Sequence, residues 1–99
     1  MRAQRFALEM PVRYRPVGEM EWLEGTTQNI SYSGLLFRAG RALDIDTPVE
    51  ISITLPVSTA SQLTCQARIV RAETYLAEPP VALAAAFSEY QLVPFLNQA

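Results

Sequence analysis

Alternating apolar and polar positions recur along this chain and predict a protein built from β-strands. The clearest segment is Val-Glu-Ile-Ser-Ile-Thr-Leu at residues 49–55, in which every second residue is apolar. Strict alternation of this kind is typical of a strand with one buried face. Pro48 and Pro56 bracket the segment, which suits the two ends of a strand because proline cannot donate to the hydrogen-bond ladder.

The same pattern, together with the turn residues between the segments, predicts six strands. We expect strands at Leu8–Arg15, Met20–Gln28, Gly34–Ala39, Val49–Leu55, Leu63–Val70 and Val81–Phe87. Pro11 favours an edge position or a bulge in the first of them, and Gly25 indicates a bulge in the second. Proline, glycine and serine are concentrated between the segments, as expected of turns.

Six short strands separated by turns predict a small antiparallel barrel or sandwich. A closed barrel would also remove exposed strand edges, which helps a domain of this size. Helical structure is expected only near the C-terminus, where Pro94 would restrict it to a short piece. We therefore expect a single domain over residues 1–99, with an arm at 1–7, a barrel at 8–90 and a short helical tail at 91–99.

Composition agrees with one small domain. The chain has 99 residues, of which 49% are hydrophobic, enough for one modest core. No stretch approaches the roughly 18 apolar residues that a membrane-spanning helix needs, and the first residues lack the apolar stretch of a secretory signal. We therefore expect a cytoplasmic protein without membrane insertion, or one module of a larger chain.

The inventory of reactive side chains argues against catalysis. Histidine is missing and Cys65 is the only cysteine, which rules out an intrachain disulfide and a zinc site of His and Cys ligands. A cysteine nucleophile usually works with a histidine base, so we expect Cys65 to be a small core residue. Trp22, Phe37 and Phe87 are also expected to fill the core. With no catalytic constellation, we expect no enzyme, no metal and no cofactor.

Charge is unevenly distributed. All eight basic residues are arginines; residues 1–15 hold four of them with one acid, and residues 16–99 hold four with nine acids. Arginine can contact phosphates and guanine edges through two parallel hydrogen bonds. A duplex-binding protein normally has a broad basic face. A short arginine arm on an acidic body therefore favours a small anion over a nucleic-acid polymer, with solvated strand-edge charges as the alternative.

One short polar motif stands between two predicted strands. Asn29-Ile30-Ser31-Tyr32-Ser33-Gly34 offers an amide and, two residues later, a hydroxyl, which face the same way in extended backbone. Gly34 permits a positive φ or the close approach of another group. The alternative interpretation is an ordinary polar turn, whose side chains bond to nearby backbone.

The order of these features resembles the PilZ family of cyclic di-GMP receptors. Members have an N-terminal Arg-x-x-x-Arg followed by [Asp/Asn]-x-Ser-x-x-Gly. The second motif is complete here at Asn29, Ser31 and Gly34. The first is incomplete, since position 1 is methionine and what remains is Arg2-x-x-Arg5.

The resemblance covers nearly the whole chain. It continues through the alternating strand at 49–55 and the segment Ala67-Arg68-Ile69-Val70-Arg71, and it ends at Ala84-Ala85-Ala86-Phe87. The family often has Gly-x-x-Phe at this last point, so Ala84 is a departure that concerns packing more than the ligand.

The resemblance implies a six-stranded antiparallel β-barrel with a short C-terminal helical tail. It also implies a site for cyclic di-GMP on the outer barrel surface, closed by the arm. The ligand-binding residues would be Arg2, Arg5, Asn29, Ser31 and Gly34, and Arg71 is an additional candidate. Ordering of the arm on binding would then transmit the signal to a protein partner, or to other domains of a larger chain.

Two other functions remain open at this stage. A PilZ-like domain that has lost or weakened nucleotide binding would serve as a protein-interaction adaptor, and the methionine at position 1 is the feature that favours it. A small barrel that binds single-stranded nucleic acid is the other alternative; the acidic body and the lack of lysine argue against it.

Overall fold

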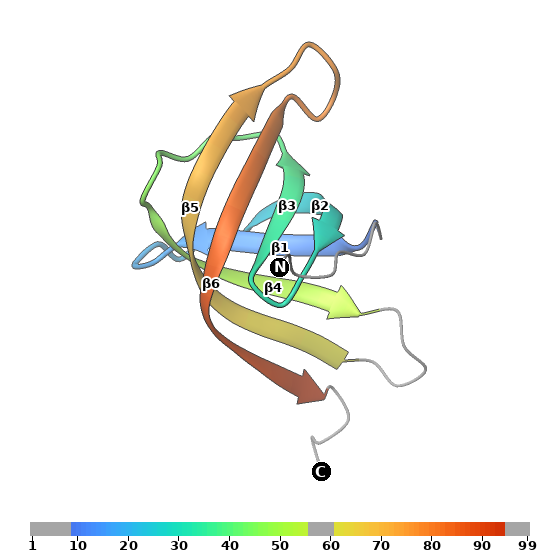
Figure 1. Cartoon of the computed structure of the whole chain (residues 1–99), viewed down its shortest axis with the longest axis vertical. Coiled ribbons are helices and arrows are strands. Elements are labelled where there is room, and N and C mark those ends of the chain that lie inside the picture. Colours follow the sequence, from blue (N-terminus) through green and yellow to red (C-terminus); the bar gives the residue numbers. More distant parts are fainter. Residues whose placement is uncertain (1–8, 56–60, 95–99) are drawn as a thin grey trace.

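Six antiparallel strands close into a barrel in this computed structural model (Figure 1), which describes residues 9–55 and 61–94. The strands are β1 (Pro11–Pro16), β2 (Leu23–Ile30), β3 (Gly34–Ala39), β4 (Pro48–Leu55), β5 (Ser61–Thr74) and β6 (Val81–Pro94). Their order around the barrel is β1-β2-β3-β6-β5-β4, and β4 pairs back onto β1. The expected all-β, six-stranded antiparallel barrel is therefore confirmed.

The alternating residues point their apolar members into the barrel. On β4, Val49, Ile51 and Ile53 are fully buried, whereas Glu50 and Ser52 between them are partly exposed. The rings of Tyr14 and Phe37 meet inside with their centroids 5.0 Å apart, an arrangement that favours aromatic pairs. The buried core therefore draws on alternate positions of several strands, as the pattern predicted.

Cys65 lies in this core, as expected. It is fully buried on β5, and burial raises the pKa of its thiol to about 12. The thiolate is the nucleophilic form of cysteine, so this thiol is inert at neutral pH. Phe37 is also fully buried, and Phe87 packs against the core while staying partly exposed.

Trp22 corrects an expectation, because it lies outside the core. It precedes β2 and remains partly exposed. The guanidinium carbons of Arg15 and Arg13 lie 4.2 and 5.3 Å from the centroid of its ring, which is cation–π contact. Arg15 also pairs with Glu50 at 2.7 Å. The indole therefore supports surface arginines and takes no part in filling the barrel.

The bulge expected at Gly25 lies further along the same strand. The register of β2 against β3 shifts between Thr27 and Asn29. Glycine is required at position 25 for another reason: a Cβ atom placed there would collide with the backbone carbonyl oxygen of Arg38 on β3. Close approach of two backbones, and not a bulge, accounts for this glycine.

The longest strands form the β5–β6 hairpin, which extends beyond the barrel at the top of Figure 1. The expected helical tail is wrong at its first four residues, because Gln91–Pro94 continue β6 and pair with Ser61–Thr64. Strand β5 is long enough to pair with these residues, so their backbone groups form hydrogen bonds across the sheet and not within a helix. Strand β6 ends at Pro94. Residues 95–99 lie outside the described part of the chain. No helix among the described residues is long and apolar enough to cross a membrane.

Candidate ligand-binding site

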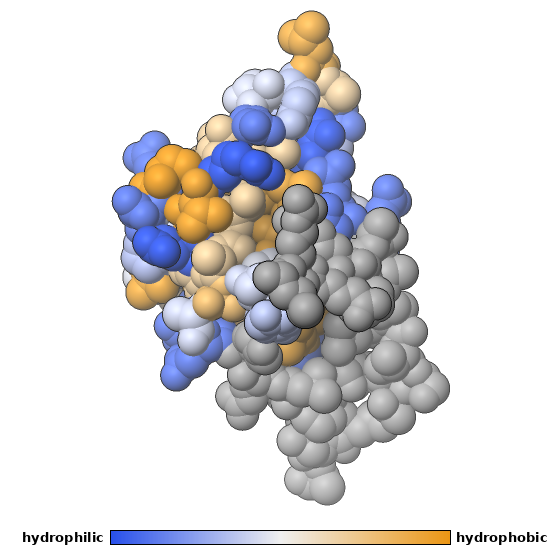
Figure 2. Space-filling view, in the orientation of Figure 1, coloured by the Kyte–Doolittle hydropathy of each residue, from blue (hydrophilic) through white to orange (hydrophobic). Residues whose placement is uncertain are grey.

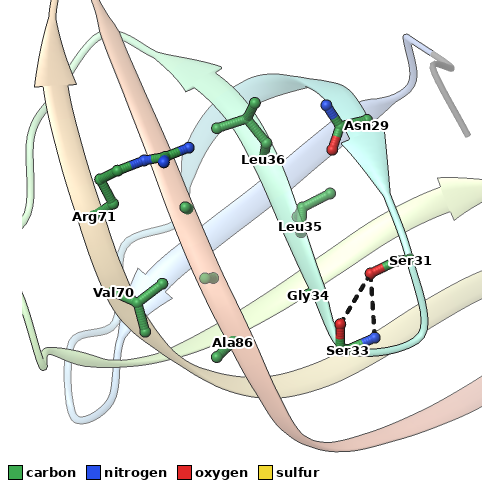
Figure 3. Close-up of a pocket in the computed structure, with 11 residues that line it drawn as sticks. Asn29, Ser31, Ser33, Gly34, Leu35, Leu36, Val70, Arg71 and Ala86 are labelled. Carbon is green, nitrogen blue, oxygen red and sulfur yellow. Dashed lines mark hydrogen bonds between the residues drawn. The ribbon is translucent and has the colours of Figure 1, made fainter. Parts of the chain in front are cut away.

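A hollow of about 240 Å³ lies on the outer surface of the barrel, over β2, β3, β6 and β5 (Figure 3). Its outward-facing residues alternate with core residues: Leu36 stands between buried Leu35 and Phe37, and Ala84 stands between buried Leu83 and Ala85. The lining residues are Asn29, Ser31, Ser33, Gly34, Leu35, Leu36, Val70, Arg71, Ala84, Ala85 and Ala86.

A bulge in β2 turns Asn29 onto this outer surface. Thr27 pairs with Phe37 and Asn29 pairs with Leu36, so Gln28 is an extra residue without a cross-strand partner. Thr27 is fully buried, and plain alternation would have placed Asn29, two residues later, inside as well. A bulge re-aims the side chains that follow it. The amide of Asn29 therefore lines the pocket, and it makes no hydrogen bond to another described residue.

The turn after β2 presents two hydroxyls beside Asn29. The backbone N–H of Ser31 donates to the carbonyl oxygen of Gly34 at 2.9 Å. The Ser31 hydroxyl oxygen accepts from the backbone N–H of Ser33 at 3.3 Å and lies 3.1 Å from the Ser33 hydroxyl oxygen (Figure 3). These bonds hold the turn in one shape, so both hydroxyls are positioned before any ligand arrives. Ser33 was not among the expected ligand-binding residues. Its position two residues after Ser31 was the signal that could have identified it, because alternate residues of an extended segment face the same side.

Gly34 allows β3 and β6 to approach each other. A Cβ atom added to it would lie 2.5 Å from the backbone carbonyl oxygen of Ala85, a distance that real Cβ atoms do not tolerate. Of the two alternatives raised by the sequence, close approach is the one observed. The neighbour at Gly34 is β6 itself, and the tight junction forms one edge of the pocket.

A second bulge turns Arg71 onto the same surface. Ile69 pairs with Ala85 and Arg71 pairs with Ala84, which leaves Val70 as the extra residue of β5. Alternation from buried Ala67 and Ile69 would have directed Arg71 inward. Because of the bulge, Val70 and Arg71 are both exposed and both line the pocket.

The two re-aimed residues stand at opposite ends of one cross-strand row. Asn29 pairs with Leu36, Leu36 with Ala84, and Ala84 with Arg71. Three strand spacings separate the ends, or about 14 Å along the sheet. The pocket therefore has an apolar floor of Leu36 and Ala84, with Asn29 at one end of the row and Arg71 at the other.

Arg71 is the only charged residue that lines the pocket in the described part of the chain. It forms no ion pair with any other described residue, whereas Arg68 on the same strand lies 3.3 Å from Asp46. A cation without a counter-charge beside an uncharged floor makes the pocket suited to an anion.

The remaining expected ligand residues, Arg2 and Arg5, lie outside the described residues. The described chain begins close to the pocket, however. Met10 exchanges two hydrogen bonds with Thr27, its N–H donating to the threonine hydroxyl oxygen at 2.8 Å and its carbonyl oxygen accepting at 2.9 Å. Thr27 is two residues from Asn29, so the arm joins the barrel beside the pocket.

Comparison with known proteins identifies the family. The PilZ domain model matches residues 1–89. A solved structure, the Bacillus subtilis inhibitor of motility MotI/DgrA, shares the fold with a TM-score of 0.78 over 92% of this chain at 18% sequence identity; this chain spans 44% of that one. No curated protein matches. Because the family model covers most of its length, the chain belongs to the PilZ domain family.

Proposed function

We propose that this protein is a receptor for cyclic di-GMP, which binds in the pocket over β2, β3, β6 and β5. The observation that carries the proposal is that Asn29, Ser31 and Gly34, the complete second motif, line one hollow together with Arg71. PilZ is a family of cyclic di-GMP receptors, and the residues present here suit a guanine-containing phosphodiester. No step of this function requires catalysis.

Each group in the pocket has a role toward such a ligand. The Asn29 amide can accept from the Watson–Crick edge of guanine and donate to its oxygen. The hydroxyls of Ser31 and Ser33 can donate to a base or a phosphate. The apolar floor of Leu36 and Ala84 excludes water from beneath the ligand, which strengthens these polar contacts.

The arm can supply the missing anion contacts. Arg5 is four residues from Glu9, the first described residue, so it can reach up to about 14 Å from there. That distance is enough to bring a guanidinium over Asn29, and Arg2 follows from the same arm. We assign Arg5 to a phosphate or to guanine O6 and N7, with Arg2 as a weaker second contact.

Binding would transmit a signal through the arm. Charge-assisted bonds to Arg2 and Arg5 would order residues 2–8 over the pocket and so present a new surface to a partner protein or domain, within the cytoplasm where a second messenger acts. Hydrogen exchange at residues 2–8 should slow when cyclic di-GMP is added. Equal exchange with and without ligand would exclude this mode of signalling.

Titration calorimetry with cyclic di-GMP tests the proposal, with GTP and cyclic GMP as selectivity controls. Asn29→Ala and Arg5→Ala should each weaken binding roughly tenfold or more. Gln28→Ala is the matched control, because Gln28 is an exposed amide next to Asn29 that does not line the pocket; its affinity should equal that of the wild type. Failure of the wild type to bind at high micromolar ligand would reject the receptor function.

A protein-interaction adaptor is the second candidate, favoured by the tip of the β5–β6 hairpin. Leu76 is fully exposed there and Tyr75 is about half exposed, and Figure 2 shows an apolar cap at this end of the molecule. The tip is held in shape: Arg38 bonds to the carbonyl oxygen of Pro79 and stacks 4.8 Å from the Tyr75 ring, whose hydroxyl donates to Glu73 at 2.6 Å.

An exposed leucine at the tip of a protruding hairpin suits insertion into an apolar groove of another protein. The name of the structural neighbour, an inhibitor of motility, is compatible with output through a partner. Leu76→Asp should then remove the cellular effect of the protein while leaving its folding and any cyclic di-GMP binding unchanged. Retained cellular output in Leu76→Asp would exclude the tip as the adaptor surface.

A further inference from the structure

The inference concerns the role of Arg71 within the pocket, and it rests on the proposed function. Figure 3 shows the Arg71 side chain reaching from β5 across β6 towards Leu36, over the floor of the pocket. This direction is a product of the bulge at Val70, which turned the arginine outward. Bulges beside functional sites commonly re-aim one side chain.

The neighbouring arginines show why this one differs. Arg68 points to Asp46 and does not line the pocket. Arg38, on the outer side of β3, donates a hydrogen bond to the Pro79 carbonyl oxygen and makes a cation–π contact with the Tyr75 ring. Arg71 alone among these three has no ion pair or hydrogen bond to a described residue, so its full set of donors remains available for a ligand.

We infer that Arg71 is the phosphate-binding residue of the pocket: its guanidinium, extended over β6, binds a phosphate of cyclic di-GMP while Asn29 and Ser31 meet a guanine edge at the β2 side. The planar guanidinium matches two phosphate oxygens with two parallel N–H donors. The lining offers no carboxylate in the described residues to compete with the phosphate for it.

The distance between Asn29 and Arg71 along the sheet supports assigning them to different parts of the ligand. The backbones of Asn29 and Arg71 lie about 14 Å apart along the sheet, with only Leu36 and Ala84 between them in the row, and the Arg71 side chain extends over β6 into this interval (Figure 3). A guanine can then lie over Leu36 beside Asn29, and a phosphate of the same ligand meets the guanidinium over β6. Arg71 belongs to the barrel and not to the arm, so this phosphate contact is independent of the incomplete arginine motif at the N-terminus.

The test compares three variants of the full chain by calorimetry with cyclic di-GMP as the probe. Arg71→Ala should weaken binding roughly 10- to 100-fold, because it removes a charge-assisted pair of hydrogen bonds. Arg71→Lys should fall between Arg71→Ala and the wild type, since it retains the charge but not the fork. Arg68→Ala, the matched loss of an exposed arginine three residues away, should change the affinity less than twofold.

Salt dependence gives a second readout that a structural role would not move. Raising the salt from about 0.05 M to about 0.5 M should weaken the wild type more than Arg71→Ala, because a phosphate ion pair is screened and the variant lacks it. Unfolding temperatures of Arg71→Ala and Arg68→Ala should agree within a few degrees, as for exposed positions. The phosphorus resonances of the bound ligand should differ between the wild type and Arg71→Ala.

The outcomes distinguish this inference from the function on which it rests. Binding by the wild type with equal affinity and equal salt dependence in Arg71→Ala would overturn the role of Arg71 and leave the receptor function standing. No binding by the wild type would overturn both. Selective weakening in Arg71→Ala, with a reduced salt dependence, supports the assignment.

Discussion

The two faces of β6 use neighbouring residues for different purposes. The inward face carries Val81, Leu83 and Ala85, all buried in the core. On the outward face, Ala84 and Ala86 line the pocket. A strand directs successive side chains to opposite faces, so a single segment contributes to the core and to the pocket floor at once.

The difference in side-chain size between the faces is informative. Leu83 fills the barrel interior, where deleted volume leaves a cavity. Ala84 keeps the outer surface hollow, and a larger residue there would occupy the space of a ligand. Changes on the inward face should therefore affect folding, and changes on the outward face should affect binding.

The largest effect is expected on the inward face. Leu83→Ala should lower the free energy of unfolding by about 2–5 kcal/mol, because it removes buried methyl groups and leaves a cavity. For a domain of this size the unfolding temperature should fall by roughly 10 °C or more. Leu36→Ala is the matched change on the outer surface, where Leu36 is only half buried, and it should cost about 1 kcal/mol or less. Equal losses measured by denaturant unfolding would contradict the distinction between the faces.

Filling the pocket should break binding without breaking the fold. Ala84→Leu places three extra carbons on the floor between Leu36 and Arg71, and cyclic di-GMP affinity should fall at least tenfold, or about 1.4 kcal/mol. Ala77→Leu adds the same three carbons at an exposed position of the β5–β6 hairpin tip that does not line the pocket, and it should leave the affinity unchanged. Unimpaired binding by a folded Ala84→Leu protein would place the ligand elsewhere.

The buried thiol of Cys65 on β5 should make the free energy of unfolding depend on pH. Its pKa is raised by burial to about 12, against an ordinary value near 9. Between these values the unfolded chain loses the proton and the folded protein keeps it, so stability present below about pH 9 is lost as the pH rises towards about 12. The loss should approach about 1.4 kcal/mol per pH unit.

Cys65→Ala removes this contribution and serves as the comparison. Burial also raises the pKa of Tyr14, but both proteins retain that tyrosine, so the difference between them isolates the thiol. Urea unfolding of both proteins between about pH 9 and about pH 11 would measure it. Parallel stability profiles would show that the thiol titrates normally and is not enclosed by the barrel.

The smallest effect is expected from a change at Asn29, on the outer surface of the barrel. Asn29→Asp should tighten cyclic di-GMP binding severalfold, or by about 1 kcal/mol, because a carboxylate accepts two N–H bonds from a guanine edge where an amide oxygen accepts fewer. The gain should disappear below about pH 4, where the carboxylate becomes protonated. Weaker binding by Asn29→Asp at neutral pH would mean that Asn29 acts as a donor to the ligand.

Much of the barrel could be predicted from local sequence. Alternation located all six strands, although β5 and β6 extend four and seven residues beyond the expected ends at Val70 and Phe87. Cys65 and Phe37 were correctly expected in the core. The expectations that were wrong share one cause, since each required knowledge of a distant partner. Gln91–Pro94 form a strand because β5 extends alongside them. Trp22 lies at the surface, where its ring makes cation–π contacts with two arginines of β1.

The sequence by itself determined the strand-forming alternation, the lack of histidine, the single cysteine and the polar motif at Asn29, Ser31 and Gly34. Only the tertiary structure decided which way Asn29 and Arg71 point. Strict alternation places both inside the barrel with Thr27 and Ile69, and the bulges at Gln28 and Val70 bring both onto one outer surface. A bulge is defined by two residues opposite one on another strand, so it depends on a pairing between distant segments that no local pattern specifies.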